Sequence, residues 1–340
     1  MERKVNPVIT VVIPCYNEVR YIQDCIISLL NNGFPSEKLE VLVVDGGSTD
    51  GTLVLLSELS QIHPQVKVLH NPSRFTPTSL NLGVMAARGE FTLISSAHAS
   101  FAHGYMQTLL KTMEEQSDAI AVGGVMRTQV KNSHAISESI KTVLMHPLGV
   151  GNAKFRTGVN ALMAVDTVPF GLFRSSLLKA SGGYDERLIR NHDMELSKRL
   201  TRGGGKIYLT PHAICTYFAR ETFIAMAKNN YNNGKWNLKT VWITRTFSSL
   251  SLRHFIPLLF LMAWVLPLLI SLVFCTALGA WFSLTLLGFY VGVLSLTAWQ
   301  ARTEDNKVLF TLMAFIVLHF AYGLGSLVGF FSLPFTPRNS

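Results

Sequence analysis

The pattern of apolar and polar residues changes near residue 253. Before that point, short runs rich in β-branched residues alternate with stretches in which apolar residues recur at helical spacing. Such short runs are typical of strands buried on both faces of a parallel sheet. They predict strands over residues 8–14, 39–44, 66–70 and 91–95, and the stretches between them predict helices over residues 21–30, 52–61 and 78–88. This alternation predicts an α/β domain with a mainly parallel sheet and helices on both faces.

Three long apolar stretches follow residue 253. Each has roughly the 20 residues that a helix needs to cross a bilayer. They cover residues 255–278, 280–299 and 308–331. We therefore expect a soluble domain over residues 1–221, a basic interfacial helical segment over residues 222–253, and a membrane domain over residues 254–340 with about three transmembrane helices.

The distribution of charge supports this division. The 340 residues carry a formal net charge of +9, with 49% hydrophobic residues and a mean hydropathy of +0.30. No Asp or Glu occurs over residues 222–303, whereas basic residues precede the first apolar stretch, namely Lys228, Lys235, Lys239, Arg245 and Arg253. Basic residues beside a span stay on the cytoplasmic side and attract anionic lipid headgroups. The placement favours membrane lipids over nucleic acid as the partner of this charge, and we expect no nucleic-acid partner.

The same rule predicts a topology. The uncharged turn near Gly279 is expected outside and the basic loop at residues 302–307 in the cytoplasm, which puts the C-terminus outside. Arg338 argues against that end point and leaves a re-entrant or interfacial third segment as an alternative. The start of the chain lacks a charged-then-apolar leader, and the four cysteines lack metal-like spacing. We therefore expect the soluble domain in the reducing cytoplasm.

Polar residues follow three of the predicted strands. They occur at Tyr16-Asn17-Glu18, over residues 45–50, and at Ser96-Ala97-His98. Because ligands of parallel sheets bind beyond the carboxyl ends of the strands, we expect these segments to form one site. Each also has a structural interpretation: Asn17 shapes a turn, Asp50 caps the next helix, and Gly46 and Gly47 permit positive φ.

Several motifs together resemble a known enzyme family. They are Val-Val-Ile-Pro-Cys-Tyr-Asn-Glu at 11–18, Val-Val-Asp-Gly-Gly-Ser-Thr-Asp-Gly-Thr at 43–52, Asn-Leu-Gly at 81–83, Ala-Arg-Gly at 87–89, and Gly-Gly-Tyr-Asp-Glu at 182–186 before Asn-His-Asp at 191–193. Over residues 8–236 the chain resembles a family 2 glycosyltransferase of the GT-A fold. It is most similar to the bacterial succinoglycan-type exopolysaccharide glycosyltransferases, which residues 149–152 and 166–174 also suit.

The resemblance implies a nucleotide-sugar site. Pro14, Tyr16 and Glu18 would contact the base and ribose, since a ring face and a carboxylate suit a uracil and its ribose hydroxyls. Asp45 would accept from the base N–H. Gly47 and Ser48 would let the backbone approach the ligand, and Arg74 and Asn81 would reach the base or the phosphates. Ser96 and Ala97 complete the predicted nucleotide-sugar site.

The metal motif of the resembled family is altered here. Members normally have Asp-x-Asp or Asp-x-His after the fourth strand, where a divalent cation binds the diphosphate. This chain has Ser96-Ala97-His98, so the first carboxylate ligand is missing. His98 is the candidate metal ligand, with packing or a direct phosphate contact as alternatives, and Ser96 would bind ribose or metal-bound water. The cofactor expected from the resemblance is Mn²⁺ or Mg²⁺, and Ser96 puts its affinity in doubt.

Asp193 is the candidate catalytic base. It lies in the first turn of a predicted helix, where the helix dipole favours a carboxylate whether or not it takes part in chemistry. The resemblance implies that it removes the proton from the acceptor hydroxyl. Asn191 and His192 would line the acceptor site, with a solvent-facing position as the alternative for His192. Lys235 and Trp236 would contact the diphosphate and a sugar ring, or else form an interfacial membrane anchor.

The function implied is an inverting hexosyltransferase that moves a sugar from a nucleotide-sugar donor, a UDP-sugar, to a polyprenyl-linked saccharide. Exopolysaccharide or other surface glycan synthesis at the cytoplasmic face of the inner membrane is the expected setting. Membrane lipids and other glycan-assembly proteins are the expected partners. One alternative is transfer directly to polyprenyl phosphate. Another is a scaffold protein of the GT-A fold with impaired catalysis, which Ser96 favours and Asp193 opposes.

Overall fold

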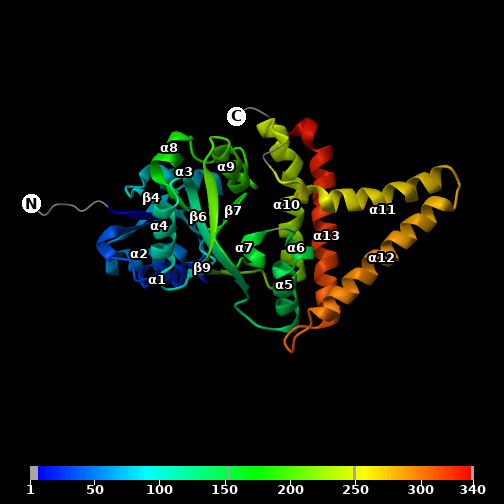
Figure 1. Ribbon diagram of the computed structural model, residues 1–340, viewed down its shortest axis with the longest axis horizontal. Helices are drawn as coiled ribbons and strands as arrows, with labels where there is room; N and C mark the ends of the chain where they lie inside the picture. The colour runs from blue at the N-terminus through cyan, green and yellow to red at the C-terminus, as the bar shows by residue number, and fades with distance from the viewer. Residues whose placement is uncertain (1–6, 152, 248–249, 338–340) are drawn as a thin grey trace, which may run out of the picture. The chain divides into compact units, whose positions relative to one another are not determined.

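The computed structural model describes residues 7–151, 153–247 and 250–337, so residues 1–6, Asn152 and Arg338 considered above lie outside it. The chain forms two compact units (Figure 1). The first unit consists of Met1–Thr128 and Lys154–Phe218. The second consists of Gln129–Ala153 and Ala219–Ser340.

The first unit is built around one mixed sheet. Its strands run in the order β3-β2-β1-β4-β8-β6-β9-β5, and β7 pairs with β9. The first four strands pair in parallel, as the sequence predicts, and end within two residues of the predicted bounds. They are β1 Ile9–Cys15, β2 Leu39–Asp45, β3 Val66–His70 and β4 Phe91–Ile94. The others are β5 Ala99–Phe101, β6 Ala119–Gln129, β7 Met163–Val165, β8 Leu172–Arg174 and β9 Lys206–Phe218.

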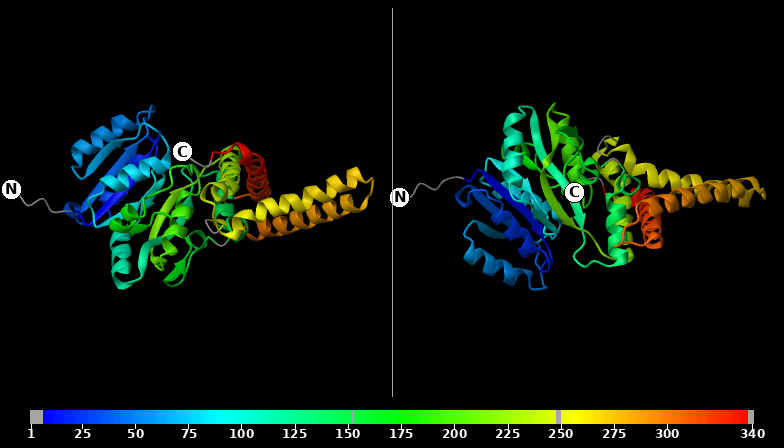
Figure 2. Two further views of the ribbon diagram at one scale, coloured as in Figure 1. Left: turned by 90° about the horizontal axis from the view of Figure 1, so that it is seen from above. Right: turned by 60° about the horizontal axis from the view of Figure 1, so that its bottom comes forward.

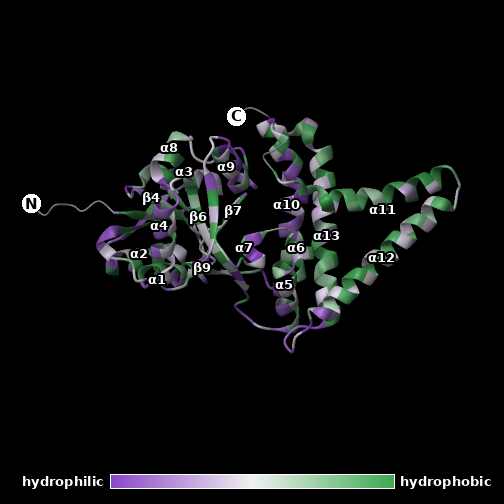
Figure 3. Ribbon diagram, in the orientation of Figure 1, coloured by the Kyte–Doolittle hydropathy of each residue, from purple (hydrophilic) through white to green (hydrophobic). Residues whose placement is uncertain are grey.

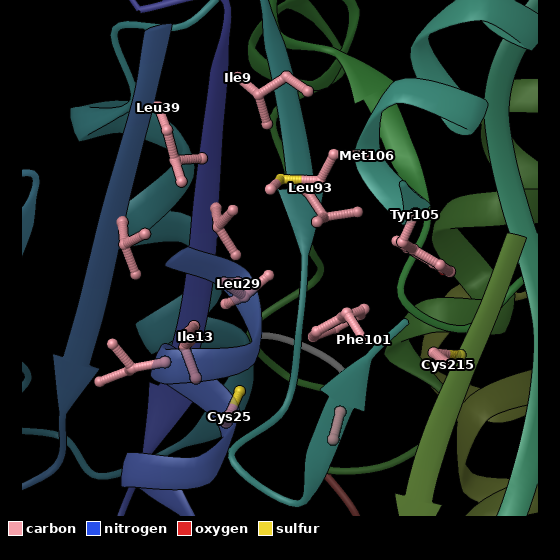
Figure 4. Packing of buried hydrophobic residues seen from close by; sticks show 14 of the residues in the cluster. Ile9, Ile13, Cys25, Leu29, Leu39, Leu93, Phe101, Tyr105, Met106 and Cys215 are labelled. Carbon is pink, nitrogen blue, oxygen red and sulfur yellow. The ribbon is translucent and has the colours of Figure 1, made fainter. Parts of the chain in front are cut away.

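Helices cover both faces of this sheet, which confirms the predicted fold class. They are α1 Ile22–Leu30, α2 Thr52–Ile62, α3 Thr76–Ala86, α4 Tyr105–Glu115, α7 Lys154–Thr157, α8 Ser175–Ala180 and α9 His192–Thr201. Val11 and Ile13 of β1 face a core shared with α1, α2 and α4, whereas Val12 between them faces a core shared with α3, α8 and α9. Figure 4 shows Cys25 and Leu29 of α1 packed over the sheet beside Ile13. Alternation along one strand therefore supplies both cores.

The second unit is helical. It contains α5 Ala135–Met145, α6 Pro147–Val150, α10 Phe223–Thr244, α11 Ile256–Val273, α12 Leu278–Gln300 and α13 Val308–Phe331. The last three have the length and composition needed to cross a membrane, as the sequence predicts (Figure 3). In Figure 1, α11 and α12 form a hairpin whose two helices contact each other near the connecting turn and splay apart toward α13, and Figure 2 shows the same hairpin in two further views. Only 11% of the most apolar window of each is buried inside the protein, compared with 33% for α13.

Helix α13 owes its larger burial to close packing on α10. The backbones approach so closely that a Cβ atom added at Gly234 would lie 2.0 Å from the carbonyl oxygen of Tyr322, and one added at Gly325 would lie 2.0 Å from that of Tyr231. The buried Asn237 side chain donates to the Tyr322 hydroxyl at 3.0 Å. Small residues and interhelical hydrogen bonds of this kind hold helices together where lipid weakens the hydrophobic driving force.

We predict that Gly234→Ala destabilises the protein. Alanine normally stabilises a helix by about 1 kcal/mol relative to glycine, but here the new methyl group would collide with the α13 backbone, an overpacking that costs about 1–3 kcal/mol. Thermal unfolding of the purified protein in detergent should therefore give a lower Tm for Gly234→Ala. The matched control is Gly288→Ala on α12, where no atom lies within 4 Å of the added Cβ among the described residues. Its Tm should equal or exceed that of the wild type, and equal effects of the two variants would contradict the packing argument.

Candidate functional site

A cleft of about 490 Å³ opens in the first unit beyond the ends of β1 and β4. Its walls come from five stretches of the chain. They are the end of β1 with the loop after it (Pro14, Cys15, Tyr16, Glu18), Arg74 with the first turns of α3 (Thr76, Ser79, Leu80), the end of β4 with the residues after it (Ile94, Ser95, Ser96), β8 with the segment before it (Val168, Pro169, Phe170, Gly171, Phe173), and α9 with the turn before it (Tyr184, His192, Asp193, Leu196, Ser197). This is the edge at which parallel sheets bind ligands.

The carboxylate of Asp45 organises the loop after β2. Asp45 is fully buried, and its Oδ2 accepts from the backbone N–H groups of Gly47 at 2.7 Å and Ser48 at 2.9 Å. Its Oδ1 accepts from the Ser48 hydroxyl at 2.5 Å. That hydroxyl oxygen in turn accepts from the backbone N–H of Asn17 at 2.8 Å. One acidic side chain therefore ties together the loops that follow β1 and β2.

A second set of contacts strengthens the same junction. Asn17 has a φ of 55°, a left-handed conformation that asparagine tolerates, and its Oδ1 accepts from the N–H of Thr49 at 2.8 Å. Asp50 accepts from the N–H of Thr52 at 3.1 Å at the start of α2 and from the N–H of Val19 at 3.3 Å. Asn17 shapes the turn, in agreement with its structural interpretation. The N-cap of α2 is Gly51 rather than Asp50, and Asp50 instead joins the two loops through its hydrogen bonds.

The aromatic ring of Tyr16 and the guanidinium group of Arg74 lie close together in the cleft wall. The Tyr16 side chain is 43% exposed, and the guanidinium carbon of Arg74 lies 5.8 Å from the centroid of its ring. Both residues line the cleft with Pro14 and Glu18. An exposed aromatic face beside a positive charge suits a planar base attached to phosphate.

His98, the predicted metal ligand, is paired with Glu18. Its Nε2 lies 2.8 Å from Glu18 Oε1, and its ring centroid lies 4.4 Å from that of Tyr21. Ser96 lines the cleft, whereas Ala97 is buried. Within residues 7–151, 153–247 and 250–337, no group of three or more His, Cys, Asp or Glu side chains is arranged to hold a metal ion. The protein ligands alone therefore do not fit a tightly held divalent cation.

Asp193 lies in the first turn of α9, where it lines the cleft beside His192 and Tyr184. Burial, and after it the negative charge of Asp193, raises the pKa of the Tyr184 hydroxyl well above its usual range. Burial lowers the pKa of the His192 imidazole, although the Asp193 charge partly opposes this, so His192 is neutral near pH 7. Its Nδ1 is buried without a hydrogen-bond partner in the described part of the chain. The start of α9 therefore offers the cleft a carboxylate and a neutral imidazole.

Asn81 positions the turn that leads to α9. Its amide nitrogen donates to the carbonyl oxygen of Tyr184 and to Glu186 Oε1, both at 2.9 Å, and its Oδ1 accepts from the N–H of Tyr184 at 2.7 Å. A Cβ atom at Gly183, where φ is 69°, would lie 2.3 Å from Asn81 Oδ1, so only glycine fits there. Asn81 thus acts as a link between α3 and this turn.

The cleft brings together seven of the residues nominated from sequence: Pro14, Tyr16, Glu18, Arg74, Ser96, His192 and Asp193. Seven others of the first unit do not line it: Asp45, Gly47, Ser48, Asn81, Ala97, His98 and Asn191, although His98 reaches it through Glu18. Asn191 caps α9 with a φ of 61°. Lys235 and Trp236 lie on α10 in the second unit, so their roles stay predictions.

Sequence analysis did not nominate the wall formed by Val168, Pro169, Phe170 and Gly171. This segment belongs to a motif of the resemblance, but its residues are apolar and carry no chemical signature. The Tyr105 hydroxyl donates to the carbonyl oxygen of Phe170 at 3.0 Å, and Phe170 has a φ of 47°. A left-handed, bulky residue held by a buried tyrosine is visible only in the folded chain.

Comparisons with known proteins agree with this architecture. The family model for glycosyl transferase family 2 matches residues 10–179, which is half of the chain. The chain is 27% identical over 322 residues to the succinoglycan biosynthesis protein ExoA of Rhizobium meliloti (strain 1021), covering 93% of this chain and 92% of the relative. It is 29% identical over 233 residues to dolichyl N-acetyl-alpha-D-glucosaminyl phosphate 3-beta-D-2,3-diacetamido-2,3-dideoxy-beta-D-glucuronosyltransferase of Methanococcus voltae, covering 66% of this chain and 71% of the relative.

A solved structure shares the fold. It is the mannosyltransferase PcManGT from Pyrobaculum calidifontis in complex with GDP-Man and Mn²⁺, which superposes with a TM-score of 0.61 at 18% identity. The match covers 95% of this chain and 88% of that chain.

We predict that Asp45→Asn loosens the cleft. An amide places an NH₂ group where one oxygen now accepts hydrogen bonds, so at least one buried donor loses its partner, at a cost of about 2 kcal/mol or more. The variant should have a lower Tm and weaker nucleotide binding, measured by calorimetry. Glu37→Gln, an exposed carboxylate change remote from the cleft lining, is the control. Wild-type Tm in Asp45→Asn would show that the loop does not depend on this carboxylate.

Proposed function

The chain belongs to glycosyl transferase family 2, so its reaction is the transfer of a sugar. We propose that it moves the sugar from a UDP-linked donor to a lipid-linked saccharide, with inversion of the configuration at the anomeric carbon. The observation that carries this proposal is the presence of Asp193 in the same cleft as Tyr16, Glu18 and Arg74. A base and a nucleotide-binding surface in one cleft are what transfer from a nucleotide sugar requires.

The donor would occupy the end of the cleft nearest the β1 loop. The exposed ring of Tyr16 offers a stacking surface for uracil, and the Glu18 carboxylate offers an acceptor for ribose hydroxyls. Arg74, held beside the ring, would offset phosphate charge. Asp45 supports this surface from beneath through its hydrogen bonds to the neighbouring loop.

The acceptor would approach from the start of α9. Asp193 takes the proton of the acceptor hydroxyl while that oxygen forms a bond to the anomeric carbon, and the bond from that carbon to the nucleoside diphosphate breaks. Attack opposite the leaving group inverts the anomeric configuration. Neutral His192, with an Nδ1 lone pair free of protein partners in the described residues, would accept a hydrogen bond from a sugar hydroxyl. Asn191 at the helix start would line the same surface.

The membrane helices support a lipid-linked acceptor. We propose that the protein is a multi-pass inner-membrane protein with its catalytic domain, residues 1–221, in the cytoplasm. The basic segment, residues 222–253, would lie at the membrane interface. There Lys235 would contact the acceptor diphosphate and Trp236 a sugar ring. The name of the Methanococcus voltae relative describes a dolichyl-linked acceptor, and that of the Rhizobium meliloti relative describes succinoglycan synthesis. Three apolar helices favour addition of single sugars over processive synthesis through a channel of its own.

We propose that Mn²⁺ or Mg²⁺ binds this protein more weakly than it binds relatives with an Asp in place of Ser96. His98 would be the protein ligand, and donor phosphate oxygens would complete the coordination. The solved mannosyltransferase is described with Mn²⁺, which supports cation use in this fold. The cation, when bound, would offset charge on the leaving diphosphate.

We predict that Asp193→Asn folds and binds UDP like the wild type but transfers sugar about 10²- to 10⁴-fold more slowly, because the amide cannot accept the proton. The measurement is transfer from a panel of labelled nucleotide sugars into the lipid fraction of membranes containing the protein. Asp185→Asn, whose carboxylate pairs with Arg187 outside the cleft lining, is the control. Wild-type rates in Asp193→Asn would remove it as the base, and nucleotide binding by the wild type without any transfer would favour the scaffold alternative.

We predict that Ser96→Asp strengthens metal binding. The new carboxylate would stand beside His98 and supply the hard oxygen ligand that the chain lacks. Titrating turnover with Mn²⁺, with and without chelator, should give a lower half-saturating concentration for Ser96→Asp than for the wild type. Ser96→Asn, similar in size and without charge, should not produce this shift. If the wild type already binds Mn²⁺ as tightly as Ser96→Asp, the weakened-site hypothesis fails.

A further inference from the structure

Arg156 is a cation whose charge is not matched by the surrounding protein. It lies on the short helix α7 and is partly buried. Its Nη1 donates to the Thr128 hydroxyl at 3.1 Å. Its guanidinium carbon lies 5.6 Å from the ring centroid of Tyr217 and 5.8 Å from that of Phe155. Across the described ranges of the chain, it forms no ion pair.

Three other arginines of the first unit are paired with carboxylates. Arg88 lies 2.8 Å from Glu40, and Arg187 lies 2.7 Å from Asp185. Arg199 lies 2.8 Å from Glu195 and also donates to two backbone carbonyl groups. A guanidinium has five N–H donors and stays charged in proteins, so a single hydroxyl leaves most of the capacity of Arg156 unused. Burial lowers the pKa of this guanidinium, which is the effect expected of a charge removed from water without a counter-charge.

The surroundings hold Arg156 in place for a ligand. Thr128 is buried near the end of β6, and Tyr217 lies near the end of β9, so the guanidinium is fixed by two strands of the same sheet. An aromatic face orients a guanidinium without consuming its N–H groups. The donors therefore remain available in one plane, the arrangement that binds two oxygens of a phosphate at once.

Arg156 is connected to His98 through Tyr217, and it does not itself line the cleft. Tyr217 pairs with Ala99, next to His98, and its ring centroid is 6.4 Å from that of His98. His98 in turn contacts Glu18, which lines the cleft. This is the end of β4 at which the family's carboxylate–metal pair normally offsets phosphate charge, and where this chain has Ser96.

We infer that Arg156 binds a phosphate group beside Tyr217 and His98, next to the cleft, and supplies positive charge that the altered Ser96-Ala97-His98 motif does not. The inference rests on the proposed transfer from a nucleotide sugar. The proposed reaction offers two candidate ligands: the diphosphate of the donor and the phosphate of the lipid-linked acceptor. Both are phosphate esters with oxygens that a guanidinium recognises in the same way.

The test uses the purified full-length protein in detergent, with Arg156→Gln and Arg156→Lys as variants. The control is Arg127→Gln, an exposed arginine on β6 one residue from Thr128. Calorimetry measures binding of UDP, uridine, inorganic pyrophosphate and undecaprenyl phosphate. Thermal unfolding without ligand reports the structural effect.

We expect Arg156→Gln to weaken binding of pyrophosphate and of at least one phosphate ligand about ten- to a hundredfold, while uridine binding stays unchanged. The affinity of Arg156→Lys for these ligands should lie between those of the wild type and Arg156→Gln, because lysine keeps the positive charge but lacks the planar set of guanidinium donors. Weaker binding of UDP would show that Arg156 contacts the donor diphosphate. Weaker binding of undecaprenyl phosphate alone would show that it contacts the acceptor phosphate. The Tm of Arg156→Gln without ligand should not fall, because the substitution removes a positive charge that forms no ion pair in the described residues.

The inference is overturned if Arg156→Gln binds pyrophosphate, UDP and undecaprenyl phosphate like Arg127→Gln, or if its Tm falls and uridine binding weakens equally. Failure of the proposed function gives a different result. In that case the wild type transfers no sugar from any nucleotide donor, whereas its pyrophosphate binding still depends on Arg156.

Discussion

The Asp45 carboxylate is the contact on which the cleft depends most directly. Parallel strands end at a common edge, and the loops beyond that edge contain backbone N–H groups that the sheet cannot satisfy. Asp45 accepts from two of them and, through the Ser48 hydroxyl, extends the network to Asn17 in the neighbouring loop. The network fixes the loop that carries Tyr16 and Glu18. The ligand surface is thereby formed before any ligand arrives, which reduces the ordering cost of binding.

Charge balance explains how such a cleft can serve a sugar-transferring enzyme whose metal motif is incomplete. Asp193 requires an environment that tolerates a negative charge, which the N-terminus of α9 provides. The phosphates of a donor require positive charge elsewhere. Arg74 supplies it beside Tyr16, and the proposed role of Arg156 would supply it beside Tyr217 and His98.

The helices of the second unit are held together by contacts that differ from those of the first unit. Helix α13 is apolar enough for a membrane. Its buried Phe315 and Leu318 belong to an apolar cluster, whereas other positions meet Gly234 and Asn237 of α10 through close backbone contact and a hydrogen bond. Close backbone contact and hydrogen bonds can hold these helices in water or in lipid, because neither depends on expelling water from large apolar surfaces. The α11–α12 hairpin lacks such a partner over most of its length and presents apolar side chains outward. It is therefore the part of this unit with the strongest requirement for lipid.

The sequence by itself determined the first four strands, the helices between them, the three apolar helices and the position of Asp193 at the start of a helix, since periodicity and capping reflect local backbone geometry and burial. Only the tertiary structure decided which side chains meet. Asn81 contacts Tyr184, 103 positions later, and His98 pairs with Glu18. Arg156 meets Tyr217 and Thr128 because β6 and β9 are neighbours in the sheet. Such contacts depend on strand order, which local patterns do not encode.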